Sequence, residues 1–167
     1  MRSLSLFILT VCAASFYSCT EAEEPTSPLI GSWENRVYID SIDYWVVQTY
    51  DFVNDSTYDI IETVRETEDG EDLGFRFESR GWYDLQGESF TYYYSDVLML
   101  DNYLMDSINP GNLYAPKEEL KAFIIDFFRE PTAKLSFSAS GREFVFLDEC
   151  LDGFPECAPP RNYVKVN

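Results

Sequence analysis

Cysteine and carboxylate side chains carry the reactive chemistry that this sequence offers, because it contains four cysteines and no histidine. Without an imidazole, Ser-His-Asp and Cys-His nucleophilic catalysis and His-based zinc or iron sites are excluded. No nucleophile is flanked by a base in the sequence. We therefore expect no enzyme, no metal site and no cofactor.

Cys150 and Cys157 enclose a short loop, ECLDGFPECAPP, which contains glycine and proline. In an exported protein this spacing predicts a disulfide, which would contribute on the order of 2 kcal/mol through the unfolded state. Two free thiols that hold a metal are the weaker alternative, because no other soft ligand lies nearby in the sequence.

Carboxylates are too numerous to mark a site by themselves, but Glu62 interrupts an otherwise apolar strand face between Ile60 and Val64. A buried glutamate that touches a ligand is one interpretation. A strand end that reaches solvent, or a shifted register, is the other.

The first part of the chain, residues 1–18, places Arg2 before an apolar core of roughly a dozen residues, which is too short to span a bilayer and is typical of a secretory signal. Cys19 follows directly, and this arrangement resembles a bacterial lipoprotein signal. The resemblance implies a lipid anchor on Cys19 and a location at the outer membrane, on its cell-surface or periplasmic face. The alternative is an ordinary cleaved signal that leaves Cys19 as a free thiol.

Residues 19–28 are acidic and contain proline, which predicts a flexible tether. The cluster of Glu21, Glu23 and Glu24 is similar to the export signals that place lipoproteins on the cell surface in the Bacteroidota. An acidic spacer that only aids solubility is the alternative.

Acidic residues outnumber basic ones by 30 to 12 over the whole chain, which gives a formal net charge of -18. Such a surface repels phosphate backbones, so nucleic-acid binding is excluded. The aromatic fraction of 17% favours β structure, because flat rings pack well on a pleated surface.

Apolar residues alternate with a period of two from Gly31 onward, which predicts strands. In FRFESRGWYDL we expect Phe75, Phe77 and Tyr83 on one face and Arg76 on the other. Residues 96–115 fit either a strand or a helix. The predicted strands are GSWENRVYI, DYWVVQTYDFV, TYDIIETV, FRFESRGWYDL, FTYYY, AKLSFSA, REFVFL and RNYVKV.

One amphipathic helix is predicted over residues 116–131, between the fifth and sixth strands. Pro116 suits the first helical position and Pro131 would end the helix. The apolar stripe is formed by Leu120, Phe123, Ile124, Phe127 and Phe128.

The regular spacing of these strands predicts an all-β fold, either a closed antiparallel barrel or a sandwich. Eight strands is the number at which a barrel can hold one small ligand. The domain would span residues 29–167.

With the strands placed, the chain resembles the lipocalin-like lipoproteins of the Bacteroidota. The matching stretches are LIGSW, YDFVNDSTY, GWYDLQGESFTYYY, SFSASGREFVFL and RNYVKV. The resemblance implies an eight-stranded lipocalin-like barrel in which Gly31 opens the first strand and Trp33 closes one end of the barrel. Arg161 or Arg142 would then pack against Trp33. The inserted segment departs from the family pattern, since lipocalins usually place their helix after the last strand.

Inward aromatic residues would either fill a solid core or line a pocket. We expect a small hydrophobic or amphipathic ligand as one function, and a filled, non-enzymatic module that binds a protein of an outer-membrane complex as the alternative. The candidate lining residues are Tyr50, Phe52, Phe75, Phe77, Tyr83, Phe90, Tyr92, Phe137, Phe144 and Phe146.

Overall fold

The structure is a computed structural model that describes residues 27–101, 103, 110–124, 131–149 and 158–166. Its secondary structure is almost entirely strand, with two short 3-10 turns, η1 (Pro110–Asn112) and η2 (Lys117–Glu119). The strands are β1 (Gly31–Ile39), β2 (Tyr44–Phe52), β3 (Thr57–Arg65), β4 (Gly74–Gln86), β5 (Ser89–Met99), β6 (Lys121–Phe123), β7 (Thr132–Phe137), β8 (Glu143–Asp148) and β9 (Arg161–Val166).

Eight of these strands close an antiparallel barrel in the order β1-β2-β3-β4-β5-β7-β8-β9, and β9 returns to β1. The ninth strand, β6, adds to the far end of β5 outside the ring. The predicted all-β barrel is therefore confirmed, and each of the eight predicted strands is present.

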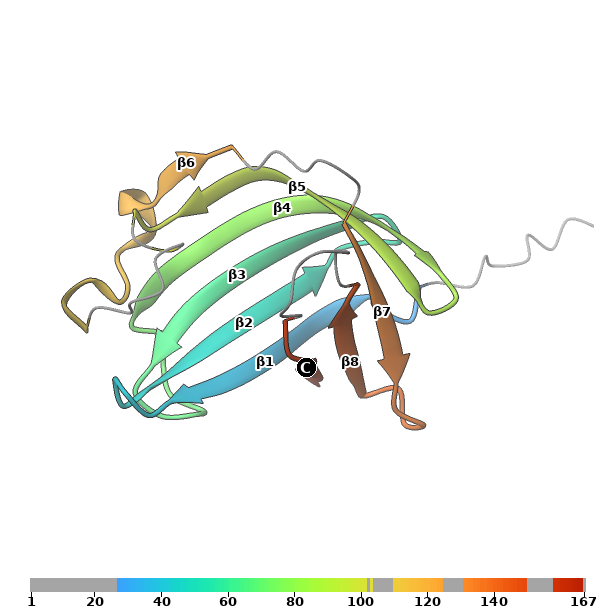
Figure 1. Ribbon diagram of the computed structural model, residues 1–167, viewed down its shortest axis with the longest axis horizontal. Coiled ribbons are helices and arrows are strands. Elements are labelled where there is room, and N and C mark those ends of the chain that lie inside the picture. The colour runs from blue at the N-terminus through green and yellow to red at the C-terminus, as the bar shows by residue number, and fades with distance from the viewer. Residues whose placement is uncertain (1–26, 102, 104–109, 125–130, 150–157, 167) are drawn as a thin grey trace, which may run out of the picture.

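The barrel is asymmetric, because its strands differ in length. The long strands β1 to β5 form a deeply curved sheet, and the short strands β7 and β8 cover one end of its concave side (Figure 1). Closure at this end depends on short ladders, since β5 pairs with β7 only over residues 89–91. The two ends of the barrel therefore have different surroundings: one is covered by short strands, and at the other Ala115 bridges to Phe75 of β4 and Leu113 is buried.

The covered end is built around the LIGSW stretch. Trp33 is fully buried, its ring lies 4.8 Å from that of Phe144, and its Nε1 donates to the Leu29 carbonyl at 2.6 Å. Gly31 has a φ of 110°, and a Cβ there would lie 3.1 Å from Cε of Lys165. Both features require glycine at this position.

The cation over Trp33 comes from a different residue than expected. Lys165 Nζ lies 5.1 Å from the centre of the Trp33 ring and donates to the Ile30 carbonyl at 2.8 Å. Neither Arg161 nor Arg142 packs on that ring among the described contacts, so this expectation was wrong. The reason is register, because Lys165 is the residue of β9 directly opposite Trp33.

Aromatic side chains fill the covered half of the barrel. Gly81 makes room for one of them, since a Cβ there would lie 2.4 Å from the Tyr58 ring. The largest fully buried side chains are Trp33, Tyr50, Tyr58, Tyr163, Phe52, Phe90, Phe144 and Phe146.

Two β-bulges change which side chains point inward. In the first, Glu62 and Thr63 of β3 oppose Phe77 and Phe75 of β4, so Arg76 is an extra residue. Phe77 is in the core cluster, whereas Phe75 is not, and Arg76 bonds to the inward Glu62. The expected shared face of Phe75 and Phe77, with Arg76 opposite, was therefore wrong.

The second bulge lies in β5. Ser95 and Leu98 pair with Arg80 and Glu78, so two residues of β5 oppose the single residue Ser79, whose Oγ donates to the Ser95 carbonyl at 2.7 Å. The inward positions then change from even to odd numbers: Phe90 is buried before the bulge, and Val97 and Met99 are buried after it. The start of the ambiguous 96–115 segment is thus strand.

The predicted helix over 116–131 is wrong where the structure describes it. Residues 117–119 form a 3-10 turn, and 121–123 pair with β5 as β6. Pairing with the exposed edge of β5 supplies hydrogen bonds to the backbone N–H and C=O groups of this segment, as a helix would. The apolar stripe is not buried as a unit, because Leu120 is 8% exposed whereas Phe123 is 44% and Ile124 is 90% exposed. Residues 125–130 lie outside the described ranges.

Two predicted modifications also lie outside the described residues, namely lipidation at Cys19 and the disulfide between Cys150 and Cys157. The signal segment and most of the predicted tether are outside them as well. In the part of the chain that is described, no helix is long and apolar enough to cross a bilayer.

Candidate ligand-binding site

Cross-strand rows divide the inner face of the long strands into levels. Trp33, Tyr50 and Ile60 oppose one another in the covered half of the barrel. The next row, Asn35, Gln48 and Glu62, is polar. The row after that is apolar again and consists of Val37, Val46 and Val64, which we call the valine row. A polar level thus lies between the aromatic core and an apolar rim.

Long side chains from β4, β5, β8 and β9 join this polar level. Most of its members make hydrogen bonds or ion pairs with one another, as described below. We define the interior polar layer as Gln48, Tyr50, Glu62, Arg76, Tyr92, Tyr94, Tyr103, Asp148, Arg161 and Tyr163.

The first ion pair of the layer joins Arg76 to Glu62. Arg76 Nε donates to Glu62 Oε1 at 2.8 Å, and each side chain is only 11% exposed. The Tyr103 hydroxyl donates to the other Glu62 oxygen at 3.2 Å, and Arg76 also donates to the Leu113 carbonyl at 3.3 Å. Glu62 is therefore buried, as the first of the two interpretations of its position requires. Its charge is balanced by Arg76, the extra residue of the bulge in β4.

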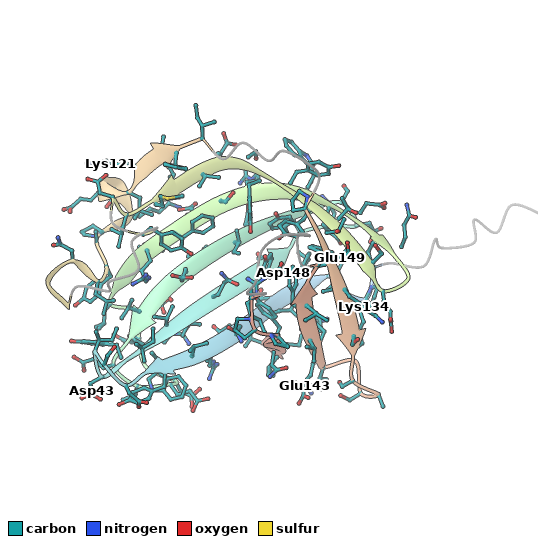
Figure 2. All side chains as sticks on the ribbon, in the orientation of Figure 1. Asp43, Lys121, Lys134, Glu143, Asp148 and Glu149 are labelled. Atoms are coloured by element: carbon teal, nitrogen blue, oxygen red, sulfur yellow. The ribbon has the colours of Figure 1, made fainter. Side chains whose placement is uncertain are left out.

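The second ion pair has the same composition. Arg161 Nη2 donates to Asp148 Oδ2 at 2.7 Å, and the Tyr92 hydroxyl donates to Oδ1 of the same carboxylate at 3.2 Å. The guanidinium lies 4.5 Å from the centre of the Phe146 ring. Asp148 stands where β8 ends, inside the curve of the long strands (Figure 2).

Gln48 connects the second ion pair to β2. Its Oε1 accepts hydrogen bonds from the Tyr163 hydroxyl and, at 3.4 Å, from Arg161 Nη1. Burial alone would lower the pKa of Arg161, but Tyr163, Tyr50 and Asp148 around it raise that pKa. Arg161 therefore stays cationic in the folded protein.

One buried donor of the layer, Nε of Arg161, has no hydrogen-bond partner among the described residues. The hydroxyl of Tyr50, a residue that is 1% exposed, interacts with the hydroxyl of Tyr94. Buried polar groups are normally satisfied, so the free N–H of Arg161 needs an explanation.

A cleft leads from the surface to Arg161. The ladder between β1 and β9 stops at the pair of Glu34 with Val164, and beyond it the Asn35 side chain donates to the Asn162 carbonyl at 2.8 Å. β1 continues past this point. The resulting opening has a volume of about 600 Å³ and includes both Val37 and Arg161 in its lining, a size that suits a small molecule.

The predicted lining residues fall into five groups. Tyr50 and Tyr92 belong to the interior polar layer, and Phe77 stacks on Tyr103 at its edge. Phe137 is partly buried beside Trp33, and Phe75 is outside the core cluster. The remaining residues pack in the covered half of the barrel: Phe52, Tyr83, Phe90, Phe144 and Phe146.

Most of the layer's polar members were not predicted as site residues. Arg76 was assigned to the outer face, and Arg161 was considered only as a partner of Trp33. One signal was available, since Gln48 and Glu62 fall opposite each other when the predicted hairpin of β2 and β3 is paired through its NDST turn. Two polar residues at the same level of an inner face mark a polar row.

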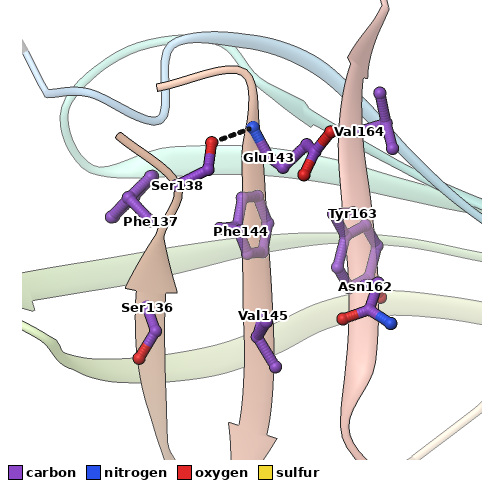
Figure 3. A pocket seen from close by; sticks show the side chains of 9 residues that line it. All are labelled: Ser136, Phe137, Ser138, Glu143, Phe144, Val145, Asn162, Tyr163 and Val164. Carbon is purple, nitrogen blue, oxygen red and sulfur yellow. Dashed lines mark hydrogen bonds between the residues drawn. The ribbon is translucent and has the colours of Figure 1, made fainter. Parts of the chain in front are cut away.

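Other hollows lie elsewhere on the barrel. One, of about 310 Å³, lies on the short strands β7 to β9 and is lined by side chains that include Ser136, Val145 and Asn162 (Figure 3). It holds no ion pair. Over the described ranges, no group of three or more His, Cys, Asp or Glu side chains is arranged to hold a metal ion.

The ionisation of tyrosine hydroxyls tests whether the tyrosines of the interior polar layer are buried in solution. Burial raises the pKa of Tyr50, Tyr58, Tyr83, Tyr92, Tyr94, Tyr103 and Tyr163. Because these hydroxyls ionise more easily in the unfolded chain, their contribution to stability is complete below a pH of about 10 and is lost as the pH rises further.

We therefore expect a spectrophotometric titration of tyrosinate to show two classes. Exposed tyrosines should titrate reversibly near their ordinary pKa, and the buried ones should ionise only together with loss of the β-sheet circular dichroism signal. A single smooth titration that leaves the fold intact would contradict the buried placement.

No protein-family model, no curated protein and no solved structure matches this chain. The proposals that follow therefore rest on the geometry and the sequence.

Proposed function

We propose that this barrel binds a small amphipathic molecule, whose polar group contacts the interior polar layer through the cleft between β1 and β9. The observation that carries the proposal is Arg161, which lines a cleft of about 600 Å³ and whose buried Nε has no hydrogen-bond partner among the described residues. The cleft offers both hydrogen-bonding groups and apolar surface to one molecule.

The energetic cost of the layer supports a binding role. Ion pairs taken out of water often stabilise a fold less than apolar side chains of the same size would. This chain has aromatic residues in abundance, yet it keeps two arginine-carboxylate pairs inside its barrel. Groups that cost stability are commonly retained for recognition.

Apolar surface lies beside the polar groups. Val37 belongs to the inner valine row but is 48% exposed, and it lines the cleft together with Val164, which is 50% exposed. A hydrocarbon portion that covered these side chains would gain about 25 cal/mol for each square ångström removed from water.

The location follows from the sequence alone. We propose that the protein is lipid-anchored through Cys19 at the outer membrane, with residues 19–28 as a tether. The support is the signal-like segment, the cysteine after it and the acidic run. Several acyl chains hold a soluble domain on a membrane far more firmly than one chain does.

A second candidate is a non-enzymatic module that binds a protein of an outer-membrane complex. The specific observation in its favour is the apolar surface at β6, where Phe123 is 44% exposed and Ile124 is 90% exposed. In-cell crosslinking from this strand would capture a defined protein neighbour if this candidate is right.

The test of ligand binding is native mass spectrometry of the purified protein after incubation with a bacterial lipid extract. We expect one bound small molecule per barrel, lost in an Arg161→Gln variant. Arg80→Gln is the matched control, because Arg80 pairs with Asp59 on the outer face at 2.9 Å and is 67% exposed. Recovery of no bound species from the wild-type protein would overturn the proposal.

A further inference from the structure

We infer that the outer face of the barrel carries a second binding site, which takes a neutral carbohydrate chain on an aromatic platform formed by Trp82 and Tyr93. This site is separate from the cleft between β1 and β9, so the inference is independent of the proposed function. Three observations carry it: the exposure of the two rings, the unused hydrogen-bonding groups around them, and a hollow that begins beside them.

The platform consists of two rings that stand directly opposite each other, Trp82 on β4 and Tyr93 on β5. Trp82 is on the outer face, because its neighbours Gly81 and Tyr83 are buried. The exposed fractions are 55% for Trp82 and 37% for Tyr93. Opposed residues of an antiparallel pair have Cβ atoms about 5 Å apart, so the two side chains form one surface. The face of an aromatic ring is negatively polarised, and the C–H groups on the flat side of a sugar ring stack on such a face.

Polar side chains surround the platform on the same face. Thr57 lies opposite Trp82 on β3, and Asp84 and Thr91 form the next pair toward the β4–β5 turn. Asp84 Oδ2 accepts from the Gln86 side chain at 2.7 Å. Asp84 Oδ1 and the two threonine hydroxyls make no hydrogen bond with any described residue. These groups can donate to and accept from the hydroxyls of a sugar.

The outer face carries another tyrosine–tryptophan pair, whose surroundings differ. Tyr38 and Trp45 oppose each other on β1 and β2, with ring centres 5.4 Å apart. The Tyr38 hydroxyl donates to Asp43 at 2.6 Å, and Arg65, opposite Trp45, donates to Asp72 at 2.7 Å. The protein itself therefore satisfies the polar groups around this pair, whereas those around the platform are open to a ligand.

A hollow begins beside the platform. Arg80 precedes Trp82 by two positions on the same face, about 7 Å along the strand. It lines an opening of about 490 Å³ on β4, β5 and β6, and β6 lies along β5 (Figure 1). Glu78 and Asp96 line this hollow as well, and Phe123 adds an aromatic side chain that is 44% exposed. A carbohydrate chain with one ring on the platform can therefore place a following ring in the hollow.

Most charges at the hollow are already balanced. Arg80 pairs with Asp59 at 2.9 Å, and Lys117 pairs with Glu78 at 2.7 Å. Asp96 is the remaining charged residue of the lining, and it is exposed. The second oxygen of Glu78, Oε2, is buried without a hydrogen-bond partner among the described residues. The hollow therefore has spare hydrogen-bond acceptors but no spare cation.

A neutral carbohydrate fits this balance better than a charged chain does. An anionic chain would meet no unpaired cation among the described residues of the site, and the net charge of -18 repels it from a distance. A cationic chain would meet two carboxylates without an ion pair in the described structure, Asp84 and Asp96. Both are exposed, and exposed ion pairs contribute little. Hydroxyl groups donate to the spare acceptors and leave every ion pair intact.

The platform is too small to be the core of a protein interface. Two aromatic side chains bury at most about 500 Å² together, whereas a stable protein interface needs on the order of 1,000 Å² or more. The cores of such interfaces also contain few charged residues. Arg80 and Asp84, however, border Trp82 on both sides along β4. An aromatic surface of this size with a polar border suits a sugar ring.

The test is isothermal titration calorimetry of the purified protein with oligosaccharides of six units that differ in charge. The neutral probes are cellohexaose, maltohexaose, mannohexaose and the hexamer of N-acetylglucosamine. The charged comparisons are the hexamers of galacturonic acid and of glucosamine. We expect at least one neutral hexamer to bind, with an affinity about tenfold or more above that of both charged hexamers.

Three variants locate the interaction. Trp82→Ala should weaken binding of the neutral hexamer about tenfold, because it removes the larger ring of the platform. Trp82→Phe keeps a ring and should retain most of the affinity, which separates loss of stacking from loss of fold. Trp45→Ala is the matched control, because Trp45 belongs to the other pair of the outer face, and it should leave the affinity unchanged.

The possible results separate this inference from the proposed function. Binding of no neutral hexamer to the wild-type protein, or tighter binding of a charged hexamer, would overturn the inference and leave binding of a lipid in the cleft intact. An equal loss in Trp82→Ala and Trp45→Ala would overturn the assignment to the platform. Arg161→Gln, which is expected to lose the molecule in the cleft, should bind the neutral hexamer as the wild type does. Loss of both ligands in Arg161→Gln would contradict a second site.

Discussion

Replacement of Trp33 with alanine is expected to lower the free energy of unfolding by about 3 to 5 kcal/mol, the range for truncation of a large buried aromatic side chain. Trp33 has no exposed surface and packs against Phe144 and Phe137, and its indole N–H donates to the Leu29 carbonyl. The substitution would leave a cavity at the covered end and an unpaired carbonyl. Urea unfolding followed by circular dichroism measures the change.

The chain offers a control of the same residue type. Trp82 lies on the outer face of β4 and is 55% exposed, so Trp82→Ala should change the free energy of unfolding by less than about 1 kcal/mol. A similar loss in both variants would mean that Trp33 does not close the barrel in solution.

Replacement of Arg76 with methionine is expected to cost about 3 kcal/mol, because it leaves the buried carboxylate of Glu62 without its cation. Methionine keeps most of the length and apolar volume of the arginine stem, so the effect reports mainly the charge. The Tyr103 hydroxyl would be the remaining donor to Glu62. Thermal and urea unfolding of the purified variant measure the loss.

Two further variants make this result specific. Arg80→Met removes an ion pair from the outer face of the same strand and should cost less than about 1 kcal/mol, because Arg80 is 67% exposed. The double variant Glu62→Met with Arg76→Met should recover most of the loss, since paired apolar replacements of a buried ion pair are often neutral or stabilising. A double variant as unstable as Arg76→Met alone would show that lost packing, and not the unpaired charge, is the cause.

The strands could be predicted because their signal is local. In GSWENRVYI and RNYVKV the alternation alone places Trp33 and Tyr163 inside, and both are fully buried. Turns such as NDST add a second local signal, and Asn54 does accept backbone hydrogen bonds from Ser56 and Thr57. The barrel follows from the number and spacing of such strands.

The errors come from interactions between distant segments. The stripe that contains Phe123 and Ile124 has helical spacing, yet the edge of β5 pairs with residues 121–123. The extra residue in β4 depends on how β3 pairs with it, and nothing in FRFESRG alone shows that Arg76 turns inward. The choice of Lys165 over Arg161 at Trp33 depends on the register between the first and last strands.

The candidate site was predicted less well than the fold for the same reason. Most of the aromatic residues chosen as lining are inward, but most of these complete the core, and Phe75 is outside the core cluster. The charged groups of the candidate site are Arg76, Asp148 and Arg161, which come from β4, β8 and β9 and form ion pairs between neighbouring strands.

The pairing of β1 with β9 also has a kinetic consequence. Lys165 donates a hydrogen bond to the Ile30 carbonyl, which lies 135 positions earlier in the sequence. The edge of β1 is therefore covered only after β9, the last strand, has been made. Contacts between such distant residues slow folding. A nascent chain that lacks β9 leaves Trp33 uncovered and the barrel open. We propose that this chain is exported. Late closure of the barrel keeps the chain unfolded, and therefore able to pass through a membrane, until its synthesis ends. Folding can then begin on the far side of the membrane.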